Sequence, residues 1–475
     1  MTAKIDVRNP RTGKIDYWLA PPTPEELAAI CDRLRQNQTD WRDSGLERRI
    51  EALQTWKQAL LSQKSKLLEV LVADTGRWWE SVLEFDAVIS TLDRWCRLAP
   101  ELLSAPEEKT TAIPFIKLTT ESVPYPLVGI ISPWNFPLLL SLIDAIPALL
   151  AGSAVVVKPS EIAPRFVRPL RETIASVPGL ADALVYIEGA GETGAALIEL
   201  ADLVCFTGSV ATGKKVAQSA ARQFIPAFLE LGGKDPAIVL ESADIELATS
   251  ALLWASTINA GQSCLSIERI YVAESIFAPF IETLTAKTKR LNLAYPSPES
   301  GEVAPIIAEK QAAIIKDHLL DALAKGALVS CGGIVEELDG GFWCHPTVLT
   351  KVGHSMKVMS EEAFAPIMPV MPFANTTEAV NLANDTIYGL SAAVFGSEPE
   401  ALEVARRIEA GAVNINDAGL TALINEGEKN SFKFSGLGGS RMGPASIKRF
   451  LRQKALLSKT NSIADPWWFK SELKN

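Results

Sequence analysis

The sequence has few of the residues that usually carry metal or disulfide chemistry. Three histidines, His318, His345 and His354, are scattered through 475 residues, and the six cysteines include no Cys-x-x-Cys pair. A zinc site needs such side chains clustered at short spacing, and a disulfide scaffold needs a much higher cysteine density. We therefore expect no metal site, and reduced thiols in a cytoplasmic protein.

Positive charge is also scarce. The chain has 46 Lys and Arg against 56 Asp and Glu, a formal net charge of −10. Nucleic-acid binding depends largely on neutralising phosphates with Lys and Arg, so the acidic balance argues against a nucleic-acid partner. Hydrophobic residues make up 48% and charged residues 21% of the chain. This is ordinary globular usage, and the length suggests about three units at roughly 150 residues each.

Long apolar runs are rare. The exception extends from Leu138 to Val157, and Asp144 is the only formally charged residue in it. Its length suits a membrane span, but Pro147 lies inside it and Gly152 divides it. We interpret it as a buried helix over about 137–150 followed by a buried strand. The polar N-terminus lacks the apolar core of a signal peptide. The sequence therefore predicts no membrane span.

Hydrophobic periodicity predicts an α/β fold. Thr23 and Glu26 form a capping-box pattern, and helical spacing continues to about residue 103. Short apolar strands then alternate with helices of about ten residues, and the alternation restarts at Pro236. Such alternation produces βαβ units with parallel strands. We expect two doubly wound α/β domains that meet near Gly232–Gly233. The first run has expected strands at 127–132, 154–158, 183–188, 203–207 and 226–231, and expected helices at 137–150, 165–176, 192–200 and 211–220.

Two glycine-rich turns could bind phosphate. Gly189-Ala-Gly191-Glu-Thr-Gly194 matches the dinucleotide pattern G-x-G-x-x-G, but no acidic residue for the ribose follows about 20 positions later. Phe206-Thr-Gly208-Ser209 also follows a strand and opens a helix, so its N–H groups and the Ser209 hydroxyl could hold a pyrophosphate. Either turn could equally be a connection that needs the backbone freedom of glycine.

Cys264 lies between an expected helix and an expected strand, where a loop residue would line a cleft. No histidine base is near it in sequence, and the suggestive acid is Glu230, at a strand end before two glycines. Taken alone, Cys264 fits an inert buried thiol, as do the other five cysteines. Asn135 likewise fits a turn residue, and Glu161 fits a carboxylate at the start of a solvent-facing helix.

Six segments together resemble the aldehyde dehydrogenase superfamily, in the family's order and over nearly the whole chain. Glu230 precedes Cys264 by 34 positions, which is the spacing in the family. In the segment that ends at Pro366, Ala365 replaces the glycine of the family motif. The segments are Ser132-Pro-Trp134-Asn135-Phe136-Pro137, Lys158-Pro-Ser160-Glu161, Phe206-Thr-Gly208-Ser209, Glu230-Leu-Gly-Gly-Lys234, Gly261-Gln-Ser-Cys264 and Glu361-Glu362-Ala-Phe364-Ala-Pro366.

The resemblance implies oxidation of a small-molecule aldehyde to a carboxylic acid. Cys264 would attack the aldehyde and carry a thiohemiacetal and then a thioester. The Asn135 amide and the Cys264 backbone N–H would hold the oxyanion, and Glu230 would activate the hydrolytic water. A carboxylate base explains why no catalytic histidine is needed.

The resemblance also implies a site for NAD, with NADP usable. In it, Lys158 and Glu161 would bind the adenosine ribose, Ser209 the pyrophosphate, and Glu362 with Phe364 the nicotinamide end. A 2′-phosphate beside the Glu161 carboxylate would be repelled, which favours NAD, although Lys158 and Ser160 could offset this. The expected cofactor-binding residues are Ile131, Ser132, Trp134, Lys158, Ser160, Glu161, Gly191, Gly208, Ser209, Glu362 and Phe364.

The family plan implies a homodimer or homotetramer. The same plan divides this chain into a cofactor-binding domain at 1–112 and 127–232 and a catalytic domain at 233–412. It also implies oligomerisation segments at 113–126 and 445–465, and a returning segment at 413–444 near the substrate entrance. The aromatic tail Pro466-Trp-Trp-Phe469 is expected to contact a partner or a neighbouring subunit.

The returning segment departs from the family. Many members read P-F-G-G-x-K-x-S-G there, whereas this chain has Asn430-Ser431 in place of the glycine pair. We expect an unusual substrate pocket. Two alternatives remain open, a coenzyme-A-acylating relative and a non-catalytic descendant. Retention of Glu230 favours hydrolysis, and retention of Cys264, Asn135 and Glu230 together favours catalysis.

Overall fold

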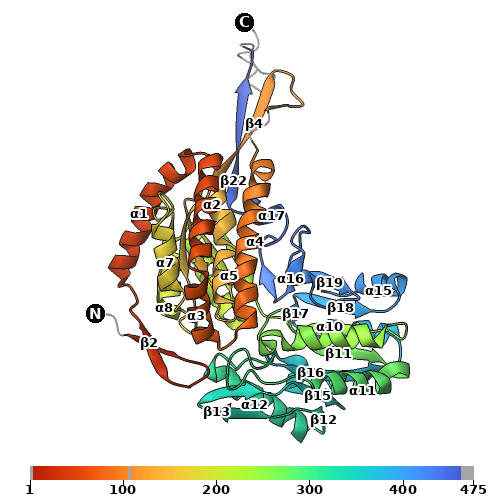
Figure 1. The fold of residues 1–475 in the computed structure, drawn as a ribbon. Coiled ribbons are helices and arrows are strands. Elements are labelled where there is room, and N and C mark those ends of the chain that lie inside the picture. Colours follow the sequence, from red (N-terminus) through yellow and green to blue (C-terminus); the bar gives the residue numbers. More distant parts are fainter. Residues whose placement is uncertain (1–3, 105–107, 462–475) are drawn as a thin grey trace.

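The chain begins with a small hairpin and four helices. The structure, a computed structural model, describes residues 4–104 and 108–461 (Figure 1). The Thr23 capping box is present, because its hydroxyl accepts from Glu26 N at 3.2 Å and its N–H donates to the Glu26 carboxylate at 2.8 Å. The elements are β1 (Ile5–Arg8), β2 (Ile15–Leu19), α1 (Pro24–Asp43), α2 (Leu46–Ser62), α3 (Lys64–Thr75) and α4 (Trp79–Leu102).

The first alternating run forms a six-stranded sheet in the order β21-β9-β8-β5-β6-β7. Strands β5 to β9 are parallel, and β21 closes one edge as an antiparallel strand from the C-terminal part of the chain. The strands are β5 (Leu127–Ile131), β6 (Ala154–Lys158), β7 (Leu184–Tyr186), β8 (Leu203–Thr207), β9 (Ala227–Glu230) and β21 (Gly436–Leu437). The helices between them are α5 (Pro137–Leu142), α6 (Ala145–Ala151), α7 (Val167–Ala175), α8 (Gly191–Leu200) and α9 (Val210–Gln223).

Helices cover both faces of this sheet, as a doubly wound fold requires. Alternate residues of β5 point to opposite cores: Val128 packs against α2 to α7, and Leu127 packs against α1, α8 and α9. Strands buried on both faces read as continuous apolar runs, which explains the unbroken Ala154–Val157 segment.

The expected helix over 137–150 is two helices, α5 and α6, with a break at Ile143-Asp144. Asp144 is buried there and binds Arg441 at 2.8 Å as well as Arg449, so its carboxylate serves a long-range ion pair. Pro147 lies in the first turn of α6. A backbone N–H at this position would have no acceptor within the helix, so proline costs no hydrogen bond there. No helix of the described ranges is long and apolar enough to cross a membrane.

A second, seven-stranded sheet follows in the order β12-β15-β16-β11-β10-β18-β19. Its strands are parallel apart from the edge strand β12, so the fold class of two doubly wound α/β units is confirmed. The strands are β10 (Asp235–Val239), β11 (Ile267–Ala273), β12 (Leu328–Cys331), β15 (Thr347–Thr350), β16 (Ile367–Phe373), β18 (Ser391–Phe395) and β19 (Ala412–Ile415). The helices are α10 (Ile245–Thr257), α11 (Phe277–Thr288), α12 (Glu309–Ala324), α13 (Lys357–Ser360), α14 (Thr376–Asn384), α15 (Glu398–Ala405) and α16 (Leu420–Leu423).

Short pairings complete this half of the molecule. The sequence patterns did not predict the hairpin of β13 and β14. The remaining elements here are β13 (Val335–Leu338), β14 (Gly341–Cys344), β17 (Tyr388–Gly389) and β20 (Phe432–Lys433). α17 (Ala445–Lys448) instead packs against α4 and α6 of the first body.

A three-stranded arm projects from the first body, away from the second (Figure 1). β22 (Leu451–Lys459) pairs antiparallel with β4 (Ile116–Pro124), and β3 (Glu108–Thr110) adds to the other edge of β4. The two segments expected in oligomerisation therefore bind each other within one chain. The aromatic tail at 466–469 lies outside the described residues.

Candidate active site

Most of the expected cofactor-binding residues lie at the carboxyl ends of the first sheet. The chain moves outward from β5 to β7 and then returns to β8 on the other side of β5. Parallel sheets bind ligands outside the strand ends at such a reversal. Ile131 and Lys158 end their strands, Ser132 and Ser160 follow them, Gly191 starts α8, and Gly208 and Ser209 connect β8 to α9.

Lys158 and Glu161 form an ion pair at the end of β6. Their Nζ and Oε2 atoms are 3.3 Å apart, with the lysine buried and the glutamate part-exposed. Burial lowers the pKa of Lys158, and the charge of Glu161 opposes that shift. The expectation that Glu161 opens a helix is wrong, because it lies in a turn and α7 begins at Val167. Ser160 stabilises this turn by accepting from Ile162 N at 3.2 Å.

The strand ends also offer unused polar groups. The Ser132 hydroxyl is buried and has no hydrogen-bond partner among the described residues. Ser209 caps α9, since its hydroxyl accepts from Thr212 N at 3.3 Å. Gly191 has open space where a side chain would lie. The unpaired Ser132 hydroxyl, the N-terminus of α9 and the open space at Gly191 are the features that binding of a dinucleotide requires.

Cys264 lies in the loop between α10 and β11. Burial raises the pKa of its thiol to about 12, and the charge of Lys429 is the largest influence in the opposite direction. The negative charge of Glu230 makes a further, smaller contribution that raises the pKa of this thiol. The resting side chain is therefore a neutral thiol rather than a thiolate.

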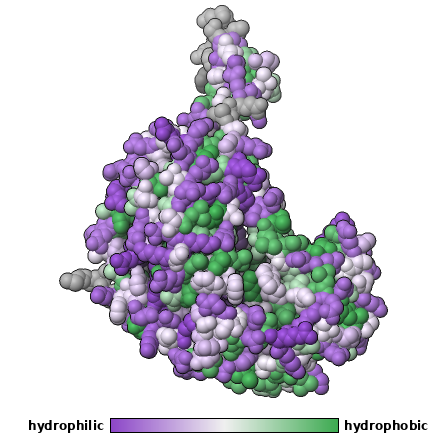
Figure 2. Space-filling model, viewed as in Figure 1, coloured by the Kyte–Doolittle hydropathy of each residue, from purple (hydrophilic) through white to green (hydrophobic). Residues whose placement is uncertain are grey.

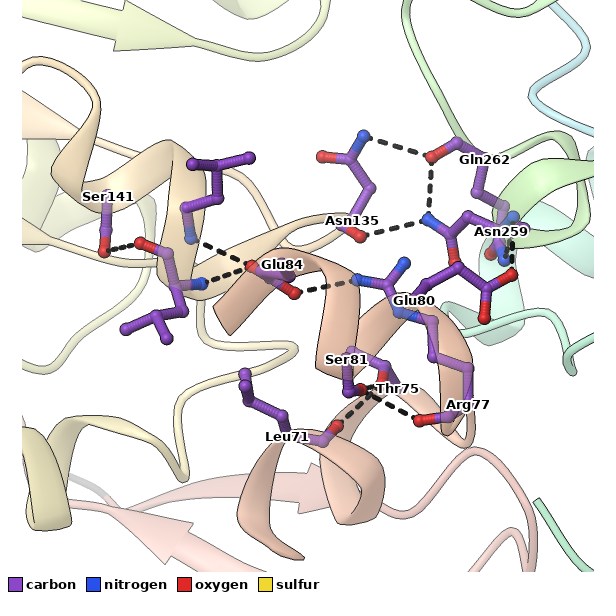
Figure 3. A network of polar contacts seen from close by, with 12 residues as sticks. Leu71, Thr75, Arg77, Glu80, Ser81, Glu84, Asn135, Ser141, Asn259 and Gln262 are labelled. Carbon is purple, nitrogen blue, oxygen red and sulfur yellow. Dashed lines mark hydrogen bonds and ion pairs between the residues drawn. The ribbon is translucent and has the colours of Figure 1, made fainter. Parts of the chain in front are cut away.

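Asn135 contacts the loop that carries Cys264 (Figure 3). Its amide nitrogen donates to the Gln262 carbonyl at 3.1 Å, two residues before the cysteine. Asn259 donates to the backbone carbonyls of both Asn135 and Gln262 at 3.0 Å. Because an amide nitrogen carries two hydrogens, the second N–H of Asn135 is left for a substrate oxygen.

A buried ion pair between Glu84 on α4 and Arg77, just before this helix, supports the segment after Asn135 (Figure 3). Glu84 accepts from the N–H groups of Leu138 and Leu139 at 2.7 and 2.9 Å and binds Arg77 at 2.9 Å. The Arg77 guanidinium also lies 4.4 Å from the centre of the Phe136 ring. Sequence reasoning missed this support, because Glu84 lies more than fifty positions from the N–H groups that it binds and belongs to no local motif.

Glu230 ends β9, and the glycines that follow it allow close packing. A methyl group on Gly233 would lie 2.4 Å from the Cys264 carbonyl oxygen, and one on Gly232 would lie 2.4 Å from Glu362 Oε2. Glycine is therefore required at position 233, where the clash is with backbone, whereas at position 232 the Glu362 carboxylate would have to move. This packing brings the segments of Glu230, Cys264 and Glu362 together.

Glu362 and Phe364 reach the first sheet from the second. Gly233 N donates to the Glu362 carboxylate at 3.1 Å, and the Phe364 ring packs edge-to-face on Trp134 at 5.6 Å. Burial raises the pKa of Glu362 to about 8, and the neighbouring charge of Glu268 adds to the shift.

Glu268 fixes the backbone of that segment and was not identified from the sequence. Its carboxylate accepts from the N–H groups of Ala363 and Phe364 at 2.7 Å each and from Lys234 Nζ at 2.6 Å. Both charged side chains are buried. A carboxylate and a lysine spaced 34 positions apart gave no recognisable signal.

Apolar side chains gather on the surface beside this junction, between the two bodies (Figure 2). The returning segment contributes exposed large apolar side chains at Leu420, Leu423, Ile424, Phe432, Phe434 and Leu437. Within the described ranges, no group of His, Cys, Asp and Glu side chains could hold a metal ion.

Comparisons with known proteins agree on one family. The family model described as "Aldehyde dehydrogenase family" matches residues 1–456. A 4,4′-diapolycopene aldehyde oxidase from Methylomonas sp is 36% identical, over 90% of this chain and 81% of its own. A Mycobacterium ulcerans protein named "Putative succinate-semialdehyde dehydrogenase" with NADP(+) is 33% identical, over 96% of this chain and 88% of its own.

Solved structures give the same result. The structure described as "Putative Aldehyde Dehydrogenase PutA" from Anabaena variabilis is 66% identical with a TM-score of 0.97, over 98% of this chain and all of that chain. Betaine aldehyde dehydrogenase from Staphylococcus aureus, in complex with NAD+, is 30% identical with a TM-score of 0.92, over 98% of this chain and 94% of its own.

Proposed function

Because this chain belongs to the aldehyde dehydrogenase family, we propose that it oxidises an aldehyde to a carboxylic acid with Cys264 as nucleophile, Asn135 as oxyanion donor and Glu230 as base. The observation that carries the proposal is the convergence of these three side chains from separate parts of the chain. Asn135 contacts the cysteine loop at Gln262, and the charge of Glu230 acts on the Cys264 thiol.

The chemistry proceeds in two half-reactions. The Cys264 thiol loses its proton to solvent, its sulfur forms a bond to the aldehyde carbon as the C=O π bond opens, and the resulting oxyanion accepts from the Asn135 amide and the Cys264 N–H. A nicotinamide cofactor held at the strand ends of the first sheet would supply the acceptor for the hydride that leaves this carbon. Glu230 then takes a proton from water, the water oxygen attacks the thioester, and the C–S bond breaks to release the acid and the thiolate.

An aldehyde panel tests the proposal. We expect NADH absorbance to rise on mixing the protein with NAD and short aliphatic, aromatic, semialdehyde or long-chain aldehydes. Product should be the free acid with or without coenzyme A. Formation of an acyl-coenzyme A would favour the acylating alternative, and no reduction with any aldehyde would favour the non-catalytic one.

The remaining features support a wider assignment. We assign residues 1–112 and 127–232 to cofactor binding, 233–412 to catalysis and 413–444 to the substrate entrance. The free state of all six cysteines supports a cytoplasmic enzyme.

The arm supports a homodimer or homotetramer. Leu456 and Leu457 are exposed on β22, which is an edge strand. Unpaired edges with apolar side chains are suited to docking against another copy. Light scattering at micromolar concentration should give a multiple of the 51.3 kDa chain mass. A single 51.3 kDa species would contradict the proposal.

We expect a higher kcat/KM with NAD than with NADP. Lys158 already pairs with Glu161, so a 2′-phosphate would meet a carboxylate whose nearest cation is engaged. Replacing Glu161 with Gln should narrow or invert the ratio of the two kcat/KM values. Equal or better efficiency with NADP in the unmutated protein would show that Lys158 and Ser160 dominate.

Cofactor affinity should increase with pH. The pKa of Glu362 is raised to about 8, so its carboxyl is largely protonated below that pH and ionised above it. An ionised carboxylate accepts roughly twice as strongly from ribose hydroxyls. The Kd for NADH, followed by fluorescence from pH 6 to 9 (about two units below that pKa to about one unit above it), should fall roughly tenfold. The Glu362→Gln variant should bind weakly with a flat profile, and a flat profile in the unmutated protein would contradict this role.

A further inference from the structure

Ser431 stands where the family pattern has glycine, and its hydroxyl contacts Glu230. Ser431 Oγ donates to Glu230 Oε2 at 3.1 Å, across 201 positions of sequence. Both residues are half-buried. Glycine at this position would offer no side-chain donor, so this contact belongs to the altered returning segment rather than to the family pattern.

The backbone that follows Ser431 is fixed by strand pairing. Phe432 pairs with Gly389, and Gly436 pairs with Glu230 itself. Between them, Ser435 accepts from Leu231 N at 2.8 Å and its hydroxyl donates to the Gly232 carbonyl at 2.7 Å. The hydroxyl of Ser431 is thus held in position by the same strand that carries Glu230.

A donor at this point restricts a flexible side chain. Glutamate has three side-chain torsions, and a base must lie within hydrogen-bond reach of the proton that it takes. The Ser431 bond engages Oε2 and leaves Oε1 to accept from water. It therefore limits the orientations of the carboxylate without using the oxygen that reacts.

We propose that Ser431 is a positioning residue for Glu230, which orients the carboxylate for hydrolysis of the thioester. The proposal rests on the proposed function, since it assigns Glu230 to water activation. Ser431 is expected to affect the hydrolytic half-reaction alone, because its hydroxyl contacts the base and not the nucleophile.

Rapid mixing with NAD and the best aldehyde tests this. Ser431→Ala should keep the rate of the first NADH turnover and slow the steady state roughly tenfold, in the range expected for losing a bond to a charged group. Ser431→Thr restores the hydroxyl and should recover most of the steady-state rate. Ser62→Ala, which removes an exposed hydroxyl at the end of α2, is the matched control and should match the unmutated protein.

A double variant separates a positioning role of Ser431 from a general structural role. In a Glu230→Ala protein, adding Ser431→Ala should cause no further loss, because the group that it orients is gone. An equal further loss in that background, a slowed first turnover, or an unchanged steady state in Ser431→Ala would each overturn the proposal. Failure of the proposed function would look different, because the unmutated protein would then form no NADH with any aldehyde.

Discussion

Replacing Cys264 with alanine should remove aldehyde-dependent NADH formation, lowering kcat/KM by at least about 10⁴-fold. Alanine has no nucleophilic atom, so no bond to the aldehyde carbon can form, and hydride transfer has no thiohemiacetal from which to start. The loss of one sulfur from a half-buried loop residue should leave the fold intact. NADH titration of the variant should therefore give an unchanged Kd.

Cys331→Ala is the matched control. Cys331 is also a half-buried free thiol, but it lies on β12, the far edge strand of the second sheet. We expect full activity from it. Turnover of Cys264→Ala within tenfold of the unmutated enzyme would overturn the assignment of the nucleophile.

Glu230→Gln should separate the two half-reactions. Glutamine preserves shape but cannot take a proton from water, so thioester hydrolysis should slow by about 10²- to 10⁴-fold. The first NADH turnover should remain fast, since Cys264 and Asn135 are unchanged. Stopped-flow absorbance should show a burst of about one NADH per active site followed by a slow steady state.

The exposed acid Glu241, just after β10, provides the control for loss of one negative charge. Its glutamine variant should behave as the unmutated enzyme. If the burst of Glu230→Gln disappears while the cofactor still binds, Glu230 serves an earlier step, such as taking the proton of the Cys264 thiol.

Local patterns predicted the first sheet well because each strand is buried on both faces. The apolar segments at 154–158 and 203–207 match β6 and β8 at both ends. Predicted helix ranges were less accurate. At the break, Asp144 binds Arg441 and Arg449, which lie 297 and 305 positions later. No local pattern contains that information.

The candidate site shows the same division. The family motifs selected segments that meet in space, as the Trp134–Phe364 contact and the Asn135–Gln262 bond show. The supporting groups were invisible, because Glu84 and Glu268 act through backbone N–H groups of distant segments. The position of such an acceptor depends on N–H groups that come close to it in the fold and not on its neighbours in sequence. Hydrophobic periodicity therefore cannot reveal it.

The closing strands also constrain the order in which the protein can fold during synthesis. β4 pairs with β22, where Arg452 bonds to Pro124 across 328 positions, and β9 receives β21 as its outer neighbour. Until the ribosome has delivered these strands, β9 is an open edge of the first sheet and β4 has an open edge in the arm. Open edges are templates for association between chains, and distant pairings form slowly. Premature termination before residue 436 would therefore leave a chain with all the catalytic residues and a strong tendency to aggregate.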